Sequence, residues 1–308
     1  MTVVDALGAI RAPGLEEYLG RLEGRLEEAV GSHPGTVAEA AAETLAAGGK
    51  RLRPALVYLA TPRALRATEH TVAAGAAVEL VHMATLVHDD LLDGAELRRG
   101  RPTTWATYGV RAAEATGDHL FARAFALLAA TGDERAVALL ANASLALARG
   151  EALQRRQAFR PDTPVDEVIA RYSLKTGTLF EAACLLGGGA EQLAGYGLAL
   201  GIAFQIVDDI LDCAGEFDTT GKAPGLDLRD GTPTIPLILA ASLDLDVRRA
   251  LAGEDVPDAL DRVVASGAIK ASRDLALGYA EQARIALDGA PDREALDALA
   301  SAVVERER

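Results

Sequence analysis

The sequence predicts an all-α protein organised as one helical domain. Apolar residues recur at helical spacing along nearly the whole chain, and in Leu80–Asp93 and Leu198–Asp212 they cover most of the helix circumference, which indicates buried helices. In Leu15–Val30 the apolar stripe is narrower and one side is charged, which is typical of a helix at the surface. Sustained alternation of β-branched residues between turn dipeptides is missing from the sequence, so strands are not expected.

Proline and glycine mark the expected helix boundaries. Thr163-Pro164, followed by two acidic residues, predicts an N-cap with proline at the first helical position. Gly187-Gly188-Gly189 separates two helices, and residues 218–236 carry so many Gly/Pro turn signals that we expect the longest loop there. Because the sequence contains nothing like a flexible linker, we expect a single domain over residues 1–308.

Composition excludes several classes of function. Half of the 308 residues are apolar and only 4% are aromatic, which suits a large core of small side chains. The net charge of −14 argues against a nucleic-acid partner, since such binding uses Lys and Arg to neutralise phosphates. Cys184 and Cys213 are far apart in sequence, so neither a zinc site nor a disulfide framework is expected. The N-terminus lacks signal-peptide features and there is no uninterrupted run of 18 apolar residues, so we expect no spanning segment and a cytoplasmic location.

Two aspartate clusters share one spacing. Each places three aspartates at i, i+1 and i+4 at the end of an apolar helix: Asp89, Asp90 and Asp93 in the first, and Asp208, Asp209 and Asp212 in the second. The outer two of each cluster are stacked one turn apart, about 5–6 Å between Cβ atoms, so their charges repel. A hard cation offsets this repulsion, and Mg²⁺ favours one or two carboxylates together with phosphate oxygens and water. The clusters therefore predict a magnesium-dependent site for a phosphate-bearing substrate.

A metal site for a phosphate-bearing substrate accounts for the clusters better than three alternatives do. A solvated acidic helix end could account for one cluster, but two that each end an apolar helix favour a metal site. A calcium EF-hand is excluded because its twelve-residue loop pattern and central glycine are missing from the sequence. Glycoside hydrolysis is disfavoured, because it needs two single acids rather than two triads.

Basic and polar residues lie at positions from which they could hold a polyanion beside the clusters. They are Lys50 and Arg53 in a GGKRLRP run, His82 two helical turns before the first cluster, Arg98 and Arg99 just after it, Lys175 and Thr176 in a helix, and Lys222 in the loop after the second cluster. A single Lys or Arg is usually a surface charge. The spacing relative to the clusters is what favours a shared site, and the three-residue interval between Lys50 and Arg53 lets these two cations converge.

The order of the motifs identifies a family. They are GGKRLRP (48–54), VHDDLLDGAELRRGRPT (87–103), GD (117–118), GEALQ (150–154), KTGTLF (175–180), FQIVDDILD (204–212), GKAPGLDL (221–228) and GTPTIPL (231–237). In this order and spacing they resemble the trans-isoprenyl diphosphate synthases, or polyprenyl synthetases, over nearly the whole chain. The resemblance implies a helical bundle of the isoprenoid-synthase type around a deep central cavity, and a homodimer.

The resemblance also implies a role for each position. Lys50, Arg53, His82 and Arg99 correspond to the pocket for isopentenyl diphosphate, and Arg98 to a ligand of the allylic diphosphate. Asp89, Asp93 and Asp208 correspond to the main Mg²⁺ ligands, three ions being expected, with Asp90, Asp209 and Asp212 in support through water or hydrogen bonds. Lys175, Thr176, Gln205 and Lys222 correspond to positions around the allylic diphosphate and the developing cation.

The expected reaction suits these residues. Breaking an allylic C–O bond leaves a carbocation and a pyrophosphate anion, and metal ions and fixed cations stabilise the anion as it forms. The double bond of isopentenyl diphosphate then attacks the cation, and loss of a proton gives a longer all-trans diphosphate. Lys175, the Thr176 hydroxyl and the Gln205 amide are the catalytic candidates that steady the cation. The resemblance implies that released pyrophosphate takes the proton, so no protein base is assigned.

Small residues before the first cluster bear on product length. Thr85, Val81 and Val78 precede Asp89 by 4, 8 and 11 residues, and Ala84 by five, so the first three are expected below it on one face. In the family, large aromatic residues four or five positions upstream stop elongation early. Small residues there favour a product of C20 or longer, unless a deeper floor is supplied by Phe121, Phe125, Tyr172 or a partner chain.

Two other functions stay open. A class I terpene cyclase shares the fold and the first cluster, but it usually carries a different second metal motif and does not need GGKRLRP. A non-catalytic subunit of a heteromeric synthase typically loses aspartates from the clusters, and here all six are present.

Overall fold

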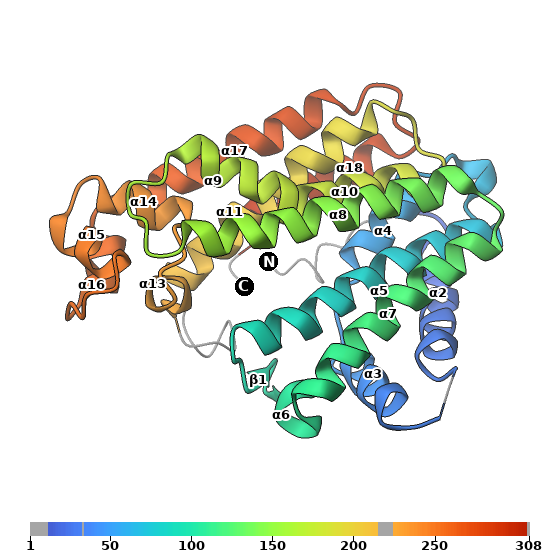
Figure 1. The fold of residues 1–308 in the computed structure, drawn as a ribbon. Helices are drawn as coiled ribbons and strands as arrows, with labels where there is room; N and C mark the ends of the chain where they lie inside the picture. The colour runs from blue at the N-terminus through green and yellow to red at the C-terminus, as the bar shows by residue number, and fades with distance from the viewer. Residues whose placement is uncertain (1–11, 33, 215–223, 307–308) are drawn as a thin grey trace.

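The computed structural model describes residues 12–32, 34–214 and 224–306, and they form a helical bundle (Figure 1). In chain order its helices are α2 (Leu15–Val30), α3 (Thr36–Ala46), α4 (Leu52–Ala60), η1 (Arg63–Leu65), α5 (Glu69–Leu92), α6 (Thr104–Tyr108), α7 (Val110–Ala130), α8 (Glu134–Gln157), α9 (Val165–Tyr172), η2 (Ser173–Gly177), α10 (Thr178–Leu186), α11 (Leu193–Ala214), α13 (Leu226–Arg229), α14 (Ile235–Ala241), α15 (Leu245–Leu251), α16 (Ala259–Ala265), α17 (Ala268–Ile285) and α18 (Arg293–Glu305). The all-α expectation is confirmed.

The core is built around α5 and α11, the two helices whose apolar residues run around the circumference. Residues 71–81 of α5 are all buried, because α2, α4, α7 and α10 pack around this helix. Helix α11 packs between α10 and α17. Two glycines permit the close contacts with α10 and with the end of η2: a Cβ on Gly197 would lie 2.6 Å from the Phe180 carbonyl oxygen, and one on Gly201 2.7 Å from the Gly177 Cα. These contacts fix the position of α11 in the bundle, and with it the position of the second aspartate cluster at the end of this helix.

Several expected boundaries differ from the structure in detail. The expectation of no strands was wrong at one place, since β1 (Leu97–Arg98) pairs antiparallel with β2 (Arg101–Pro102), with Leu97 opposite Pro102. Helix α9 begins one residue later than expected, because Pro164 is its N-cap and the Thr163 hydroxyl donates to the Arg160 carbonyl oxygen instead (2.7 Å). The glycine-rich break between α10 and α11 is confirmed.

The expected long loop over 218–236 is interrupted. Its first part lies outside the described residues, and the remainder contains α13 and the beginning of α14. Asp212 explains the extra turn, because its carboxylate accepts the backbone N–H groups of Leu226 (3.3 Å) and Asp227 (3.1 Å) at the beginning of α13. A side-chain acceptor at a helix N-terminus satisfies donors that the helix leaves unpaired.

Two described helices, α5 and α8, are long and apolar enough to cross a membrane by length and composition alone. The expectation of no spanning segment considered only uninterrupted apolar runs, which neither helix contains. In α5, 83% of the apolar 18-residue stretch is buried inside the protein, as in a core helix, whereas in α8 only 28% of the corresponding stretch is buried. Helix α8 therefore presents apolar surface outward, for example Leu145, which is 59% exposed.

Candidate active site

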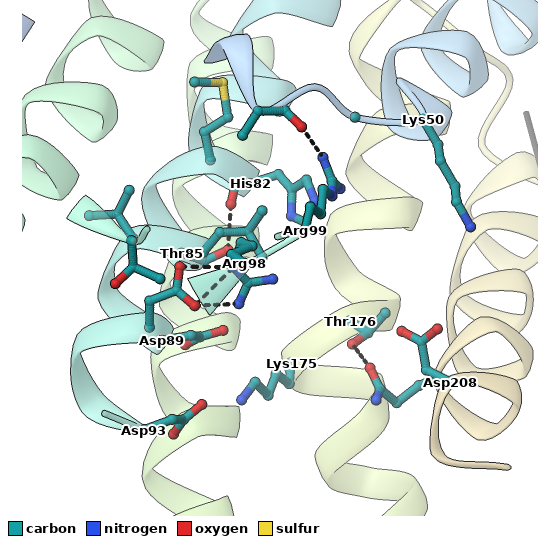
Figure 2. A pocket seen from close by; sticks show the side chains of 18 of the residues that line it. Lys50, His82, Thr85, Asp89, Asp93, Arg98, Arg99, Lys175, Thr176 and Asp208 are labelled. Carbon is teal, nitrogen blue, oxygen red and sulfur yellow. Dashed lines mark hydrogen bonds and ion pairs between the residues drawn. The ribbon is translucent and has the colours of Figure 1, made fainter. Parts of the chain in front are cut away.

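A cavity of about 1090 Å³ opens between the ends of α5 and α11. The two aspartate clusters line it from opposite sides. Figure 2 shows Asp89 and Asp93 on one side, Asp208 on the other, and Lys175 between them. The structure therefore brings together, across one cavity, residues about 120 positions apart in sequence.

In the first cluster, two carboxylates face the cavity and the third is held by an arginine. Burial raises the pKa of Asp89 to about 6, with Lys175 opposing the rise and Glu151 adding to it. Burial also raises the pKa of Asp93. Asp90 accepts two hydrogen bonds from Arg98 Nε (2.9 and 2.8 Å), and Arg98 Nη2 lies 2.7 Å from its Oδ1. In this structure Arg98 therefore fixes the supporting aspartate of the cluster.

The second cluster also divides its tasks, but here a single carboxylate faces the cavity. Asp208 faces the cavity, and its Oδ1 lies 2.7 Å from Nη2 of Arg306. Asp209 is buried and accepts hydrogen bonds from Gln205 Nε2 (2.9 Å) and from the Tyr172 hydroxyl. Burial raises the pKa of Asp209, and these two hydrogen bonds oppose the rise. Asp212 caps α13. Thus one aspartate of the cluster faces the cavity while the other two hold the surrounding structure.

Lys175 and Thr176 lie on the π-helical turn η2, and both line the cavity. Gly150 of α8 allows this approach, since a Cβ there would lie 2.7 Å from the Lys175 backbone nitrogen. Lys175 Nζ donates to Glu151 Oε2 (2.7 Å) and Gln154 Oε1 (3.2 Å). Burial lowers the pKa of Lys175, but the carboxylates of Asp89 and Glu151 outweigh it and the net pKa is raised. Lys175 is therefore a cation at neutral pH.

A hydrogen-bonded chain links η2 to the second cluster. The Thr176 hydroxyl donates to Gln205 Oε1 (2.7 Å), and the Gln205 amide nitrogen donates to Asp209. Both side chains line the cavity. The chain fixes the orientation of the Gln205 amide, so that both of these candidate cation-stabilising groups have defined positions.

The basic residues of the predicted isopentenyl diphosphate pocket gather at the other end of the cavity. Lys50, Arg53, His82 and Arg99 all line it. Arg53 is covered on one side by the Phe180 ring (4.7 Å), and burial lowers its pKa to about 10, so it remains charged at neutral pH. Burial, reinforced by the neighbouring arginines, lowers the pKa of His82 well below its ordinary value, so His82 is neutral there.

Arg99 joins this pocket through backbone contacts. Its Nη1 donates to the Gly48 carbonyl oxygen and to that of Ala47 (3.4 Å), which ties the β1–β2 turn to the GGKRLRP run. Lys50 points into the cavity on the side of Asp208 (Figure 2). Burial lowers its pKa, and Arg306 lowers it further. Several cations are thus held together, an arrangement whose mutual repulsion an anionic ligand would relieve.

The residues expected to set product length are not all at the cavity. Thr85 lines it, and its hydroxyl donates to the His82 carbonyl oxygen (2.8 Å). Val78, Val81 and Ala84 are fully buried in the hydrophobic core instead. Of the alternative floors, Tyr172 lies at the cluster end, where it donates to Asp209 and accepts from the Ile235 N–H (3.1 Å). Leu147 of α8 lines the cavity and was not expected from the sequence.

Among the charged residues at the site, Glu79, Glu151 and Arg306 were missed from the sequence, and Tyr172 was considered only as a possible floor of the cavity. The sequence gives little sign of them, apart from the position of Glu151 in GEALQ and of Glu79 one turn before His82. Lys222 lies outside the described residues, so its predicted role stays a prediction.

The carboxylates suit a metal that is completed by its substrate. Across residues 12–32, 34–214 and 224–306, no group of three or more His, Cys, Asp or Glu side chains is close enough to hold an ion alone. Asp89, Asp93 and Asp208 nevertheless face one cavity, and burial, which raises the pKa of Asp89, leaves its charge poorly compensated. Mg²⁺ keeps waters and takes substrate phosphates beside one or two carboxylates, so this donor set fits it.

Comparison with known proteins decides the family. The family model described as polyprenyl synthetase matches residues 35–255. The chain belongs to the polyprenyl synthetase family. It is 39% identical over 296 residues to heptaprenyl diphosphate synthase component 2 of Geobacillus stearothermophilus, covering 91% of this chain and 92% of that protein.

Solved structures of polyprenyl synthetases have the same fold. A decaprenyl diphosphate synthase from Rhodobacter capsulatus matches with a TM-score of 0.86 at 37% identity, over 96% of this chain and 98% of that one. A polyprenyl synthase from Caulobacter crescentus CB15, complexed with calcium and isoprenyl diphosphate, matches with a TM-score of 0.86 at 35% identity, over 99% and 98%. The resemblance read from the motifs, the all-α fold and the enzyme class, a prenyltransferase, are confirmed.

Proposed function

We propose that this polyprenyl synthetase condenses isopentenyl diphosphate with an allylic diphosphate to give an all-trans product of C20 or longer. One observation carries the proposal: a single cavity holds two opposed carboxylate clusters and, at its other end, a pocket of Lys50, Arg53 and Arg99. The carboxylate clusters, with metal ions, suit the diphosphate that leaves the allylic substrate. The basic pocket suits the diphosphate of isopentenyl diphosphate, which is retained in the product. Two anionic substrates can therefore lie side by side with their reacting carbons between the sites.

Each residue has a part in this proposal. Asp89, Asp93 and Asp208 would hold Mg²⁺, three ions by analogy with the family, which neutralises charge on the departing pyrophosphate. Lys175 places a fixed cation beside the same oxygens, and such preorganised charge costs no reorganisation during the reaction. Thr176 and Gln205 both line the cavity, and their hydroxyl and carbonyl oxygens, held in place by the hydrogen bond between them, would steady the allylic cation. The calcium and isoprenyl diphosphate in the Caulobacter relative support a divalent cation and a diphosphate here.

We expect the size of the side chains that line the cavity to limit the length of the product. Thr85 is small and lines the cavity, so the growing chain is not stopped four residues before the first cluster. The relatives named for heptaprenyl and decaprenyl diphosphates support a product beyond C20. We propose that Thr85 and Leu147 border the path of the growing chain, and that Val78, Val81 and Ala84 act behind that wall.

Assembly and location are part of the proposal. We infer a homodimer, because α8 is apolar but mostly exposed in the single chain, and a second copy would cover it. We also infer one polyprenyl synthetase domain over 1–308, supported by a hydrophobic core that runs from Leu15 to Val304, and a cytoplasmic location. Light scattering of the purified chain tests the assembly. A monomer that becomes active only with another protein would indicate a heteromeric synthase, as the name of the Geobacillus relative suggests for that protein.

Product analysis tests the reaction. The purified chain is incubated with Mg²⁺, farnesyl diphosphate and labelled isopentenyl diphosphate, and the extracted products are separated by length. Labelled linear diphosphates longer than C15 are expected. An unlabelled hydrocarbon would indicate a terpene cyclase, and no turnover without a second protein would indicate a subunit. Asp208→Ala is expected to remove most turnover while leaving the circular dichroism spectrum unchanged, and retained turnover would contradict the two-cluster arrangement.

A further inference from the structure

The guanidinium of Arg51, within GGKRLRP, pairs with two carboxylates, those of Glu23 and Glu79. Its Nε and Nη2 donate to Glu23 Oε1 (2.6 Å) and Oε2 (3.1 Å), and its Nη1 donates to Glu79 Oε1 (2.9 Å). The Arg51 side chain is 10% exposed and that of Glu79 is 4% exposed. Helices α2 and α5, which carry these two glutamates, are thereby joined through one guanidinium.

The backbone at Arg51 needs this support. Its φ of 46° and ψ of 33° lie in the left-handed region, which is strained for a non-glycine residue because its Cβ comes too close to the following carbonyl oxygen. Arg51 is the N-cap of α4, so its conformation sets the angle between Lys50 before it and Arg53 in the first turn of α4. Gly49 is packed under the same guanidinium, since a Cβ there would lie 2.6 Å from Arg51 Nη1. The side-chain contacts of Arg51 thus hold a turn that its local sequence disfavours.

Glu79 is a buried carboxylate on the wall of a pocket that is otherwise cationic. It lies on α5, one turn before His82, and lines the cavity together with Arg51. Its negative charge favours the charged forms of Arg53 and Arg99 as well as that of Arg51. By charge alone, a carboxylate at this place would repel the anion and weaken its binding. Its burial against Arg51 indicates a different role, which is to hold in place the cations that bind the anion.

We propose that the Arg51–Glu79 ion pair, extended by Glu23, is a positioning device that aims Lys50 and Arg53 at the diphosphate of the homoallylic substrate. The proposal rests on the proposed function, because it assumes that this end of the cavity binds isopentenyl diphosphate. Neither Arg51 nor Glu79 needs to touch the substrate. Their effect is on the angle of the turn, and misplacement of binding groups by about 1 Å can cost as much as a hundredfold.

Two variants of opposite charge separate positioning from simple attraction. Arg51→Gln removes a positive charge and Glu79→Gln removes a negative one, yet both break the same ion pair. Positioning predicts that both raise KM for isopentenyl diphosphate, about tenfold or more, while KM for farnesyl diphosphate changes less than about twofold. The double variant is expected to be no worse than the more impaired single variant, because the two residues act as one unit. Attraction alone predicts opposite directions, and a lowered or unchanged KM in Glu79→Gln would overturn the proposal.

The buried ion pair of Arg66 and Asp292 supplies the control. The side chains of both residues are 6–7% exposed, as buried as the proposed pair, and they join η1 to α18 away from the cavity. Asp292→Asn is expected to lower the free energy of unfolding without changing either KM. An equal rise in KM for isopentenyl diphosphate in this control would show that loss of any buried pair suffices, and would overturn the proposal.

Binding without turnover keeps the two proposals apart. Calorimetric titration of inorganic pyrophosphate into the protein in EDTA reports on the basic pocket whether or not the chain elongates a substrate. Weaker binding in both single variants supports positioning, and unchanged binding overturns it. If the wild-type chain incorporates no isopentenyl diphosphate, the proposed function fails, whereas normal incorporation by the wild type and by both variants defeats only the positioning proposal.

Discussion

Replacing Asp89 with asparagine is expected to stabilise the metal-free protein while removing its activity. Burial raises the pKa of this carboxyl from its ordinary value of 3.8 to about 6. At neutral pH the folded protein therefore holds a charge that its surroundings disfavour, worth up to about 3 kcal/mol, since each pH unit corresponds to about 1.4 kcal/mol. Asp89 still faces the water of the cavity, so we expect the asparagine to recover about 1–3 kcal/mol of the free energy of unfolding.

The pH dependence of this gain has a definite sign. A folded pKa above the unfolded one means that the wild type keeps the full stability of the protonated carboxyl below pH 3.8 and loses it as the pH rises to about 6. Asparagine cannot ionise. The difference between Asp89→Asn and the wild type should therefore be near zero below the unfolded pKa, grow between the two pKa values, and stay constant above about pH 6.

Urea unfolding in EDTA, followed by circular dichroism at about pH 7.5 and about pH 4.5, measures this difference. Asp118→Asn is the matched control, because the Asp118 side chain is 80% exposed, and a change within about 0.5 kcal/mol is expected there. The reasoning is refuted if Asp89→Asn is no more stable than the wild type at the higher pH, or if its gain is the same at both. Product assays should show that the stabilised variant has lost most turnover, a trade of stability for function.

Three further predictions concern the cavity. Lys175→Met removes the fixed cation between the clusters and is expected to lower kcat about hundredfold, with KM for isopentenyl diphosphate unchanged in steady-state assays. A change confined to that KM would contradict the placement of Lys175. Thr85→Phe puts a ring on the cavity wall and should shorten the product seen by mass spectrometry, and an unchanged product would show that this wall does not border the growing chain. Arg306→Gln frees Asp208 from its ion pair, so calorimetric titration of the substrate-free protein with Mg²⁺ should saturate at lower concentration; weaker binding would mean that Arg306 does not compete with the ion.

Local sequence determined the features whose spacing is short. The helical period predicted the fold class, and the i, i+1, i+4 interval placed Asp89 and Asp93 on one side of α5, where the structure has them facing the cavity. The same is true of Lys50 and Arg53, because three residues of chain hold both at one end of α4. These arrangements follow from the geometry of a single helix or turn, so they could be predicted before any packing was known.

Only the tertiary structure decided which partners the charged groups have. Arg306 reaches Asp208 from 98 residues away, and Glu79 meets Arg51 across 28, because α18 and α5 are packed where burial of their apolar faces places them. Helical spacing could not show that Val78 and Val81 are covered by neighbouring helices while Thr85 remains at the cavity. A helix defines the direction of each side chain, whereas the helices packed around it decide whether that direction leads to a neighbour or to open space.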